Sequence, residues 1–207
     1  MVLTPDLLVA AYQSGIFPMA DRDGRVGWYA PDPRAVLPLD AFHVPKTLAK
    51  TVRQGRFEVA VDRDFEAVMR ACAAPAPGRE ETWISDEIVA AYTTLHRLGA
   101  AHSVECWREG QFAGGLYGVA LGGAFFGESM VSRERDASKV ALVHLVDRLR
   151  TGGFALLDTQ MTTPHLERFG VVEISRVEYE RRLARALAAE ADWFALDRLG
   201  DAPEPIW

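Results

Sequence analysis

The sequence has few of the features that mark a membrane, metal or disulfide protein. Its 207 residues contain two cysteines, Cys72 and Cys106, with no CxxC and no cysteine-histidine cluster, so neither a disulfide framework nor a zinc site is expected. No stretch approaches the roughly 18 apolar residues of a membrane span, and the amino terminus lacks the basic-then-apolar order of a signal peptide. These absences predict a cytoplasmic protein with no membrane partner.

The common cofactor and nucleophile motifs are absent as well. The chain has no GxGxxG, GxxxxGK[ST], HExxH or GxSxG, which removes the usual support for a nucleotide-binding fold, a P-loop, a zinc protease or a serine hydrolase. Its five histidines are isolated in the sequence. The net charge of −6 argues against non-specific binding along a nucleic-acid backbone, although it allows a local basic face. We expect no cofactor and no metal.

What the sequence does contain is typical of a globular protein with a small first domain. Hydrophobic residues make up 49% and charged residues 25% of the chain, which is an ordinary balance. Thr4, Pro5 and Asp6 are typical of a helix start, and the segment 16–38 is rich in proline, glycine and aspartate, which predicts loops and short strands. We expect a small N-terminal region over residues 1–55 and a larger domain over residues 56–207.

Strand-forming residues dominate the middle of the larger domain. Segments 103–107, 111–121 and 124–132 are joined by Glu109-Gly110 and Gly122-Gly123, which predicts an antiparallel meander. A helix and a further strand follow, and this order predicts that strand 154–160 lies parallel to strand 124–132. The fold class is therefore α/β with a mixed sheet. A parallel pair fed by a meander is, by analogy, the outline of a GNAT-like acyltransferase domain.

The helix that precedes this meander has clear signals at both ends. Ser85 is a good N-cap, Asp86 and Glu87 follow in the first turn, and Gly99 ends the helix. An apolar face at three- and four-residue spacing is predicted to turn inward. That face consists of Ile88, Tyr92, Leu95 and Leu98.

Each of two apolar strands ends in an acid. Glu128 follows AFFG and Asp158 follows FALL, and an unpaired charge beside such strands costs several kcal/mol, more than the roughly 2 to 7 kcal/mol of a buried amide or hydroxyl. Each acid alone could cap a helix or pair with an arginine such as Arg133 or Arg135. Two acids at the ends of two strands favour a functional site.

Several motifs together resemble one family. The strings AYQSGIFPM, PDPRAV, GESM followed by SRxxxASK, and DTQ occur in order, and the resemblance to leucyl/phenylalanyl-tRNA–protein transferases extends from about Leu3 to Leu187. It implies an enzyme that moves leucine or phenylalanine from aminoacyl-tRNA to the N-terminal α-amino group of proteins beginning with arginine or lysine. That transfer marks the acceptor protein for degradation. We expect this enzyme to work as a monomer.

The resemblance also assigns residues to the reaction centre. It implies that Asp158 and Gln160 are catalytic and that Glu128 and Asp158 bind the acceptor. The spacing of two places the side chains of Asp158 and Gln160 on one face of a strand, where they could share a bound amine. Asp158 could instead only hold the positive amino terminus, with proton transfer by the tRNA or by water.

For the donor, the resemblance implies an apolar pocket and a platform for the terminal adenosine. The platform is Trp83, which stacks on the base, with Met19 at the position where better-known members have a second aromatic residue. Core packing is the alternative for each pocket residue. The implied pocket residues are Leu116, Phe125, Met130, Leu142, Leu145, Leu149 and Leu157.

Two other functions stay open. One is a tRNA-dependent aminoacyl transferase with another acceptor, such as a cell-wall precursor, which would call for basic residues against pyrophosphate. The other is a non-catalytic tRNA- or peptide-binding module, which has no need of the DTQ triplet. The acids Glu128 and Asp158 favour a protein acceptor with a cationic first residue.

Overall fold

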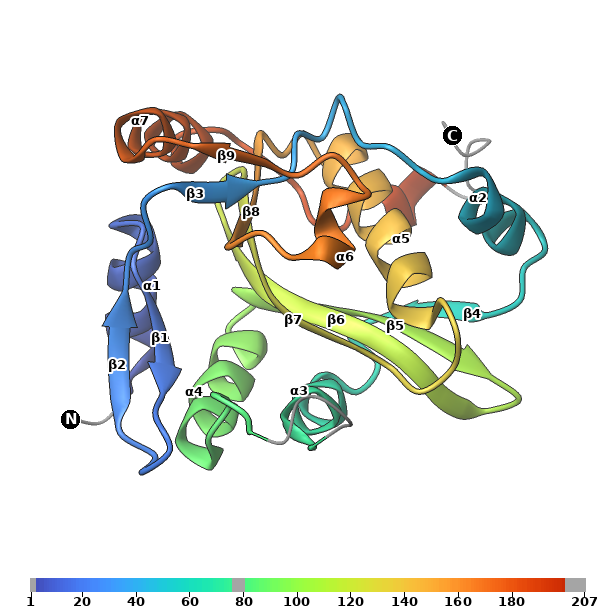
Figure 1. Cartoon of the computed structure of the whole chain (residues 1–207), viewed down its shortest axis with the longest axis horizontal. Coiled ribbons are helices and arrows are strands. Elements are labelled where there is room, and N and C mark those ends of the chain that lie inside the picture. The colour runs from blue at the N-terminus through green and yellow to red at the C-terminus, as the bar shows by residue number, and fades with distance from the viewer. Residues whose placement is uncertain (1–2, 76–80, 200–207) are drawn as a thin grey trace.

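A seven-stranded sheet in the order β4-β5-β6-β7-β8-β3-β9 forms the centre of the molecule (Figure 1). The structure is a computed structural model and describes residues 3–75 and 81–199. The strands of this sheet are β3 (Arg34–Val36), β4 (Glu58–Val61), β5 (Ala101–Arg108), β6 (Gln111–Leu121), β7 (Ala124–Ser132), β8 (Leu156–Gln160) and β9 (Val172–Ile174).

The pairing of the strands confirms the predicted fold class. Strands β4 to β7 are antiparallel neighbours, and β8 runs parallel to β7. In the β5–β6 turn, Glu109 and Gly110 have φ values of 51° and 74°, the left-handed conformation that a tight two-residue hairpin requires. The sheet is therefore mixed: the antiparallel meander leads into the parallel pair of β7 and β8. This is the arrangement on which the GNAT-like expectation was based.

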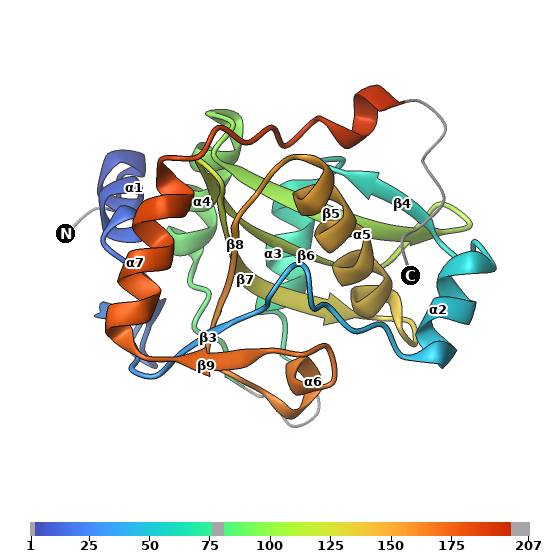
Figure 2. The same ribbon diagram turned by 90° about the horizontal axis from the view of Figure 1, so that it is seen from above.

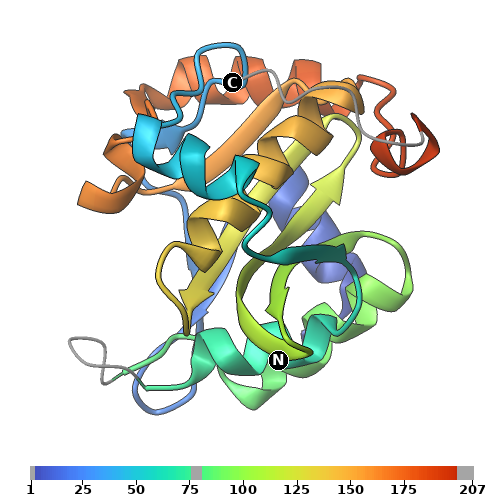
Figure 3. The same cartoon turned by 90° about the vertical axis from the view of Figure 1, so that its right-hand side faces the viewer.

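Helices cover both faces of the sheet. Figures 1 and 3 show α5 on one face and α3 and α4 on the other. Two buried apolar clusters correspond to these two layers. The helices are α1 (Pro5–Gln13), α2 (Lys46–Arg53), α3 (Phe65–Ala73), α4 (Asp86–Arg97), α5 (Ala137–Thr151), α6 (Pro164–Glu167) and α7 (Arg176–Leu187), followed by the short 3-10 helix η1 (Leu196–Leu199). None of the described helices is long and apolar enough to cross a membrane.

The helix ends follow the capping residues, with one correction on α4. The Ser85 side chain accepts a hydrogen bond from the backbone N–H of Ile88, as expected of an N-cap. The prediction that Leu98 faces inward was wrong, since its exposed fraction is 68%. The helix ends at Arg97, and Leu98 is its C-cap before the left-handed Gly99, so Leu98 turns away from the face formed by Ile88 and Leu95.

The N-terminal part of the chain is joined to the large sheet by β3. Helix α1 and the two-stranded sheet of β1 (Phe17–Ala20) and β2 (Val26–Tyr29) lie together at one end of the molecule, and α7 lies beside α1 (Figures 1 and 2). Strand β3 then enters the sheet between β8 and β9, and α2 contacts α5. The predicted boundary at residue 55 stays a prediction, and some elements before it belong to the large sheet.

Candidate active site

Strands β7 and β8 separate at the point where the candidate residues lie. Their pairing covers three residue pairs and ends at Phe126 opposite Asp158. In the β6–β7 ladder, Gly118 pairs with Gly127 and the next pair is Tyr117 with Ser129, which leaves Glu128 as the extra residue of a β-bulge. Because a bulge bends and twists its strand, β7 turns away from β8 here, as Figure 1 shows.

A cavity of about 470 Å³ lies next to this separation. Of the seven residues predicted for the donor pocket, five line it: Leu116, Met130, Leu142, Leu145 and Leu157. The other two, Phe125 and Leu149, have exposed fractions of 0% and are packed in the α5-side core without lining the cavity. The wall that β6, β7, β8 and α5 share is thus apolar.

Polar groups of β7 and β8 line another part of the same cavity. Glu128 and Gln160 both line it, and the Gln160 amide nitrogen lies 3.4 Å from Oε1 of Glu128. Gln160 has a φ of 57°, a left-handed conformation that is uncommon for a side-chain-bearing residue. Among the described residues that line the cavity, Glu128 is the only one with a carboxylate, and none is a lysine or arginine.

Asp158 lies behind this cavity and is fully enclosed by partners. Its Oδ2 accepts hydrogen bonds from Nη2 of Arg34 at 2.7 Å and from the Tyr179 hydroxyl at 2.7 Å. Its Oδ1 accepts from Nε of Arg34 at 3.0 Å and from the backbone N–H of Gln160 at 2.8 Å. The exposed fraction of Asp158 is 0% and it does not line the cavity. Asp158 therefore holds the backbone of Gln160 in place.

Arg34 is the partner that the sequence did not single out. Its guanidinium lies between the rings of Phe17 and Tyr179, 5.0 Å and 4.5 Å from their centroids, and its Nη1 donates to the carbonyl of Gly15. The arginines considered as partners for the acids lie elsewhere, since Arg133 stacks over Phe112 and Arg135 contacts Asp136. The one available signal was an arginine within the otherwise apolar run after Pro33.

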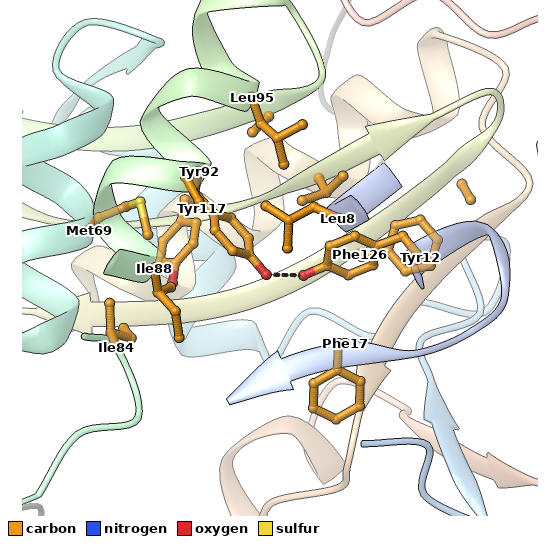
Figure 4. Close-up of a cluster of buried hydrophobic side chains, with 14 of the residues drawn as sticks. Leu8, Tyr12, Phe17, Met69, Ile84, Ile88, Tyr92, Leu95, Tyr117 and Phe126 are labelled. Atoms are coloured by element: carbon orange, nitrogen blue, oxygen red, sulfur yellow. Dashed lines mark hydrogen bonds between the residues drawn. The ribbon is translucent and has the colours of Figure 1, made fainter. Parts of the chain in front are cut away.

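Three tyrosines surround the carboxyl of Glu128. Tyr12 of α1, Tyr92 of α4 and Tyr117 of β6 are fully buried, and the Tyr12 and Tyr92 hydroxyls are hydrogen-bonded to each other (Figure 4). Glu128 as a residue is half-buried and borders the cavity, and its carboxyl interacts with the hydroxyls of Tyr12 and Tyr92. Burial raises the pKa of Glu128 to about 8, against the opposing effect of hydrogen bonding by Tyr12, and the negative charge of Asp158 also raises it.

The predicted adenosine platform lies at a second cavity. Trp83 lines a hollow of about 550 Å³ together with Asp21 and Arg22, and its carbonyl accepts a hydrogen bond from the backbone of Ala20 at 3.0 Å. Met19, its predicted partner, packs with Trp83 against the α4-side core and does not line the hollow. The structure thus places both residues in one neighbourhood, and of the two Trp83 is the one that lines the hollow.

Two histidines that are apart in the sequence come together in space. His96 and His102 lie with Asp62 in a group whose potential ligand atoms are within 4.8 Å of one another. Nδ1 of His102 is 2.7 Å from Asp62, and Nδ1 of His96 is 2.8 Å from the carbonyl of Ala101. These polar atoms are thus already hydrogen-bonded within the protein. The prediction of a protein without a metal stays a prediction.

Comparisons with known proteins agree with the motifs. The family model described as leucyl/phenylalanyl-tRNA protein transferase matches residues 36–184, and the model of that family's N-terminal domain matches residues 1–32. A leucyl/phenylalanyl-tRNA–protein transferase of Salinibacter ruber is 60% identical over 195 residues, 94% of this chain and 84% of the relative. One of Rubrobacter xylanophilus is 63% identical over 188 residues, 90% of this chain and 96% of the relative.

The chain therefore belongs to the leucyl/phenylalanyl-tRNA protein transferase family. This confirms the family resemblance and the prediction of an aminoacyltransferase. The chain is also weakly similar to solved structures. One is a ribosomal-protein-alanine N-acetyltransferase from Brucella melitensis, with a TM-score of 0.38 and 18% identity over 66% of this chain and 94% of that one. Another is the C-terminal domain of a putative lysylphosphatidylglycerol synthetase from Agrobacterium fabrum, with a TM-score of 0.43 and 11% identity over 88% of this chain and 57% of that one.

Proposed function

We propose that this protein transfers leucine or phenylalanine from aminoacyl-tRNA to the α-amino group of proteins that begin with arginine or lysine, which marks them for degradation. It acts as a monomer in the cytoplasm, where charged tRNA and nascent acceptors are found. The observation that carries the proposal is one cavity with an apolar wall and, at the split between β7 and β8, an amide and a carboxyl group.

The apolar wall suits the donated side chain. Leucine and phenylalanine share hydrophobicity and length, and a volume of about 470 Å³ leaves room for either together with the ester group. A charged or strongly polar side chain against Leu116, Leu142 and Leu145 would lose its water without a hydrogen-bonding partner, which disfavours such donors. Trp83, supported by Met19, stacks on the terminal adenosine.

The chemistry requires positioning of the reactants and little else. The ester of aminoacyl-tRNA is already activated, so an amine held against its carbonyl carbon gains rate from proximity and orientation. Gln160 orients that amine by hydrogen bonding. Asp158 supports Gln160 through the backbone bond at Oδ1, and the ion pair with Arg34 fixes Asp158 in turn.

The acceptor meets the carboxyl group of Glu128. Because Glu128 is the one carboxyl-bearing residue among the described cavity residues, a cationic first residue of the acceptor favours the ionised form of this carboxyl and pairs with it. Arginine is preferred to lysine, since its planar guanidinium can bind a carboxylate with two hydrogen bonds. A cell-wall precursor would require basic side chains to bind its pyrophosphate. The described lining of the cavity contains no lysine or arginine, which disfavours such an acceptor.

The proposal is tested by measuring transfer of radiolabelled leucine from tRNA to peptides that begin with arginine, lysine or alanine. Incorporation should be highest with arginine, lower with lysine and lowest with alanine. The matched control is the arginine peptide with an acetylated α-amino group, which should accept no leucine. Equal use of all three free peptides would contradict cationic selection, and transfer to a lipid-linked cell-wall precursor alone would replace the protein acceptor.

A further inference from the structure

The proton that leaves the attacking amine needs an acceptor. Among the described residues that line the cavity, Glu128 has the one carboxyl group, and burial lowers the pKa of His165, the one imidazole there. Asp158 cannot take this proton without losing a partner, because both of its oxygens accept hydrogen bonds from Arg34 and each accepts another, from Gln160 or Tyr179. Gln160 carries an amide, which is not basic. We propose that Glu128 is the general base of the transfer, and that Tyr12 and Tyr92 are positioning residues that hold its carboxyl group. This inference depends on the function proposed above.

The groups that face Glu128 come from several elements. Tyr12 on α1 and Tyr92 on α4 provide hydroxyls, linked to each other by a hydrogen bond (Figure 4), and both affect the carboxyl by hydrogen bonding. Gln160 on β8 approaches it at 3.4 Å. Behind Gln160, Asp158 on β8 carries a negative charge and Arg34 on β3 a positive one. Tyr117 on β6 is a further titratable neighbour.

This environment gives the carboxyl group a suitable basicity. Burial raises the pKa of Glu128 to about 8, which is close to the roughly 7.7 to 8.0 of an α-amino group. Proton transfer is most effective when the pKa of the base lies near the working pH. A carboxyl group of ordinary pKa would hold a proton too weakly to remove it from an amine.

The step is balanced without a co-reactant. The amine nitrogen forms a bond to the ester carbonyl carbon, and Glu128 takes one proton from that nitrogen as the bond forms. The bond between the carbonyl carbon and the ribose oxygen of the tRNA then breaks, and the proton passes from Glu128 to that oxygen. The products are the extended peptide and uncharged tRNA, and Glu128 is again ionised.

The test measures kcat as a function of pH with saturating arginine peptide. In the parent, kcat should rise with pH and level off above the Glu128 pKa. Glu128→Gln should lower kcat by about 100-fold to 10,000-fold for both arginine and alanine peptides. Tyr12→Phe removes one hydroxyl that stabilises the ionised carboxyl, so the rise should move to higher pH, with about 10-fold lower kcat at pH 6.5 and the same plateau.

The α-amino group of the acceptor titrates in the same range and needs a separate control. An acceptor whose α-amino group is replaced by an aminooxy group is unprotonated throughout, so a rise that remains belongs to the enzyme. Tyr179→Phe is the matched control, because it removes a buried hydroxyl bound to Asp158, and it should leave the position of the rise unchanged.

The outcomes separate this inference from the proposed function. A parent enzyme that transfers no leucine would refute the function itself. An active parent whose Glu128→Gln variant keeps its kcat and shows only a higher KM for the arginine peptide would overturn the inference, because Glu128 would then only bind the acceptor. If Glu128→Gln fails to fold, the Tyr12→Phe profile decides, and an unshifted rise overturns the inference.

Discussion

Replacing Arg34 by methionine should destabilise the protein strongly. The change keeps most of the side-chain length but removes the guanidinium that binds both oxygens of Asp158 and the carbonyl of Gly15. Asp158, with an exposed fraction of 0%, would keep only Tyr179 and the backbone of Gln160 as partners. Loss of one member of a buried ion pair costs about 3 to 5 kcal/mol, which lowers the melting temperature of a chain this size by about 6 to 20 °C.

Urea unfolding followed by circular dichroism measures this difference. Arg22→Met is the matched control, because Arg22 pairs with Glu81 while 83% of its side chain is exposed, and such surface pairs contribute about 1 kcal/mol or less. Adding Asp158→Asn to Arg34→Met removes the unpaired charge and should recover part of the loss. If the free energy of unfolding of Arg34→Met lies within about 1 kcal/mol of the parent value, the reasoning is refuted, because Asp158 would then not depend on Arg34 to compensate its buried charge.

Three further changes test other parts of the structure. Leu142→Phe adds volume to the cavity wall and should reduce transfer of phenylalanine more than that of leucine. Phe125→Leu, behind the wall, should lower stability without changing the ratio of the phenylalanine and leucine transfer rates. The same rate ratio in both variants would argue against this cavity as the donor pocket. Trp83→Ala should weaken binding of aminoacyl-tRNA by about 5-fold to 150-fold, the equivalent of roughly 1 to 3 kcal/mol of base stacking, and Trp83→Phe should keep most of the affinity in a filter-binding assay at fixed salt. Burial, with the nearby Arg148 cation, lowers the pKa of His144 to about 4, so its contribution to stability is present above its unfolded pKa of about 6.5 and is lost as pH falls toward 4. His144→Leu should therefore lose less unfolding free energy than the parent between pH 7 and pH 5, and an identical acid dependence of the two proteins would contradict the assignment.

Local signals in the sequence were sufficient for the long strands and the capped helices. The bounds predicted for segments 111–121 and 124–132 are those of β6 and β7, because Glu109-Gly110 and Gly122-Gly123 fix the two turns. Strand β3 was not predicted as a member of the large sheet. It has three residues, too few for a periodic pattern, and its neighbours β8 and β9 are distant in the chain.

The candidate site shows the same limit. The acids Glu128 and Asp158 were recognisable because each follows an apolar run, although both lie within β7 and β8 and not at the strand ends as predicted. Their surroundings depend on long-range contacts. Arg34 is separated from Asp158 by 124 positions, and Tyr12 from Tyr92 by 80. The two acids differ in burial and in partners: Glu128 lines the cavity, whereas Asp158 is enclosed behind it. The family resemblance had implied that both acids bind the acceptor.

The position of β3 in the sheet also determines when, during translation, the reaction centre can be completed. Synthesis proceeds from the amino terminus, so Arg34 is made long before β8 and β9, the two strands between which β3 lies. A nascent chain that ends at α5 contains the residues of the meander and both Tyr12 and Tyr92, but it lacks Asp158 and Gln160. Only after β8 has been added can β3 find its first neighbour. An unfinished chain is thus without a complete reaction centre until most of its length has been translated.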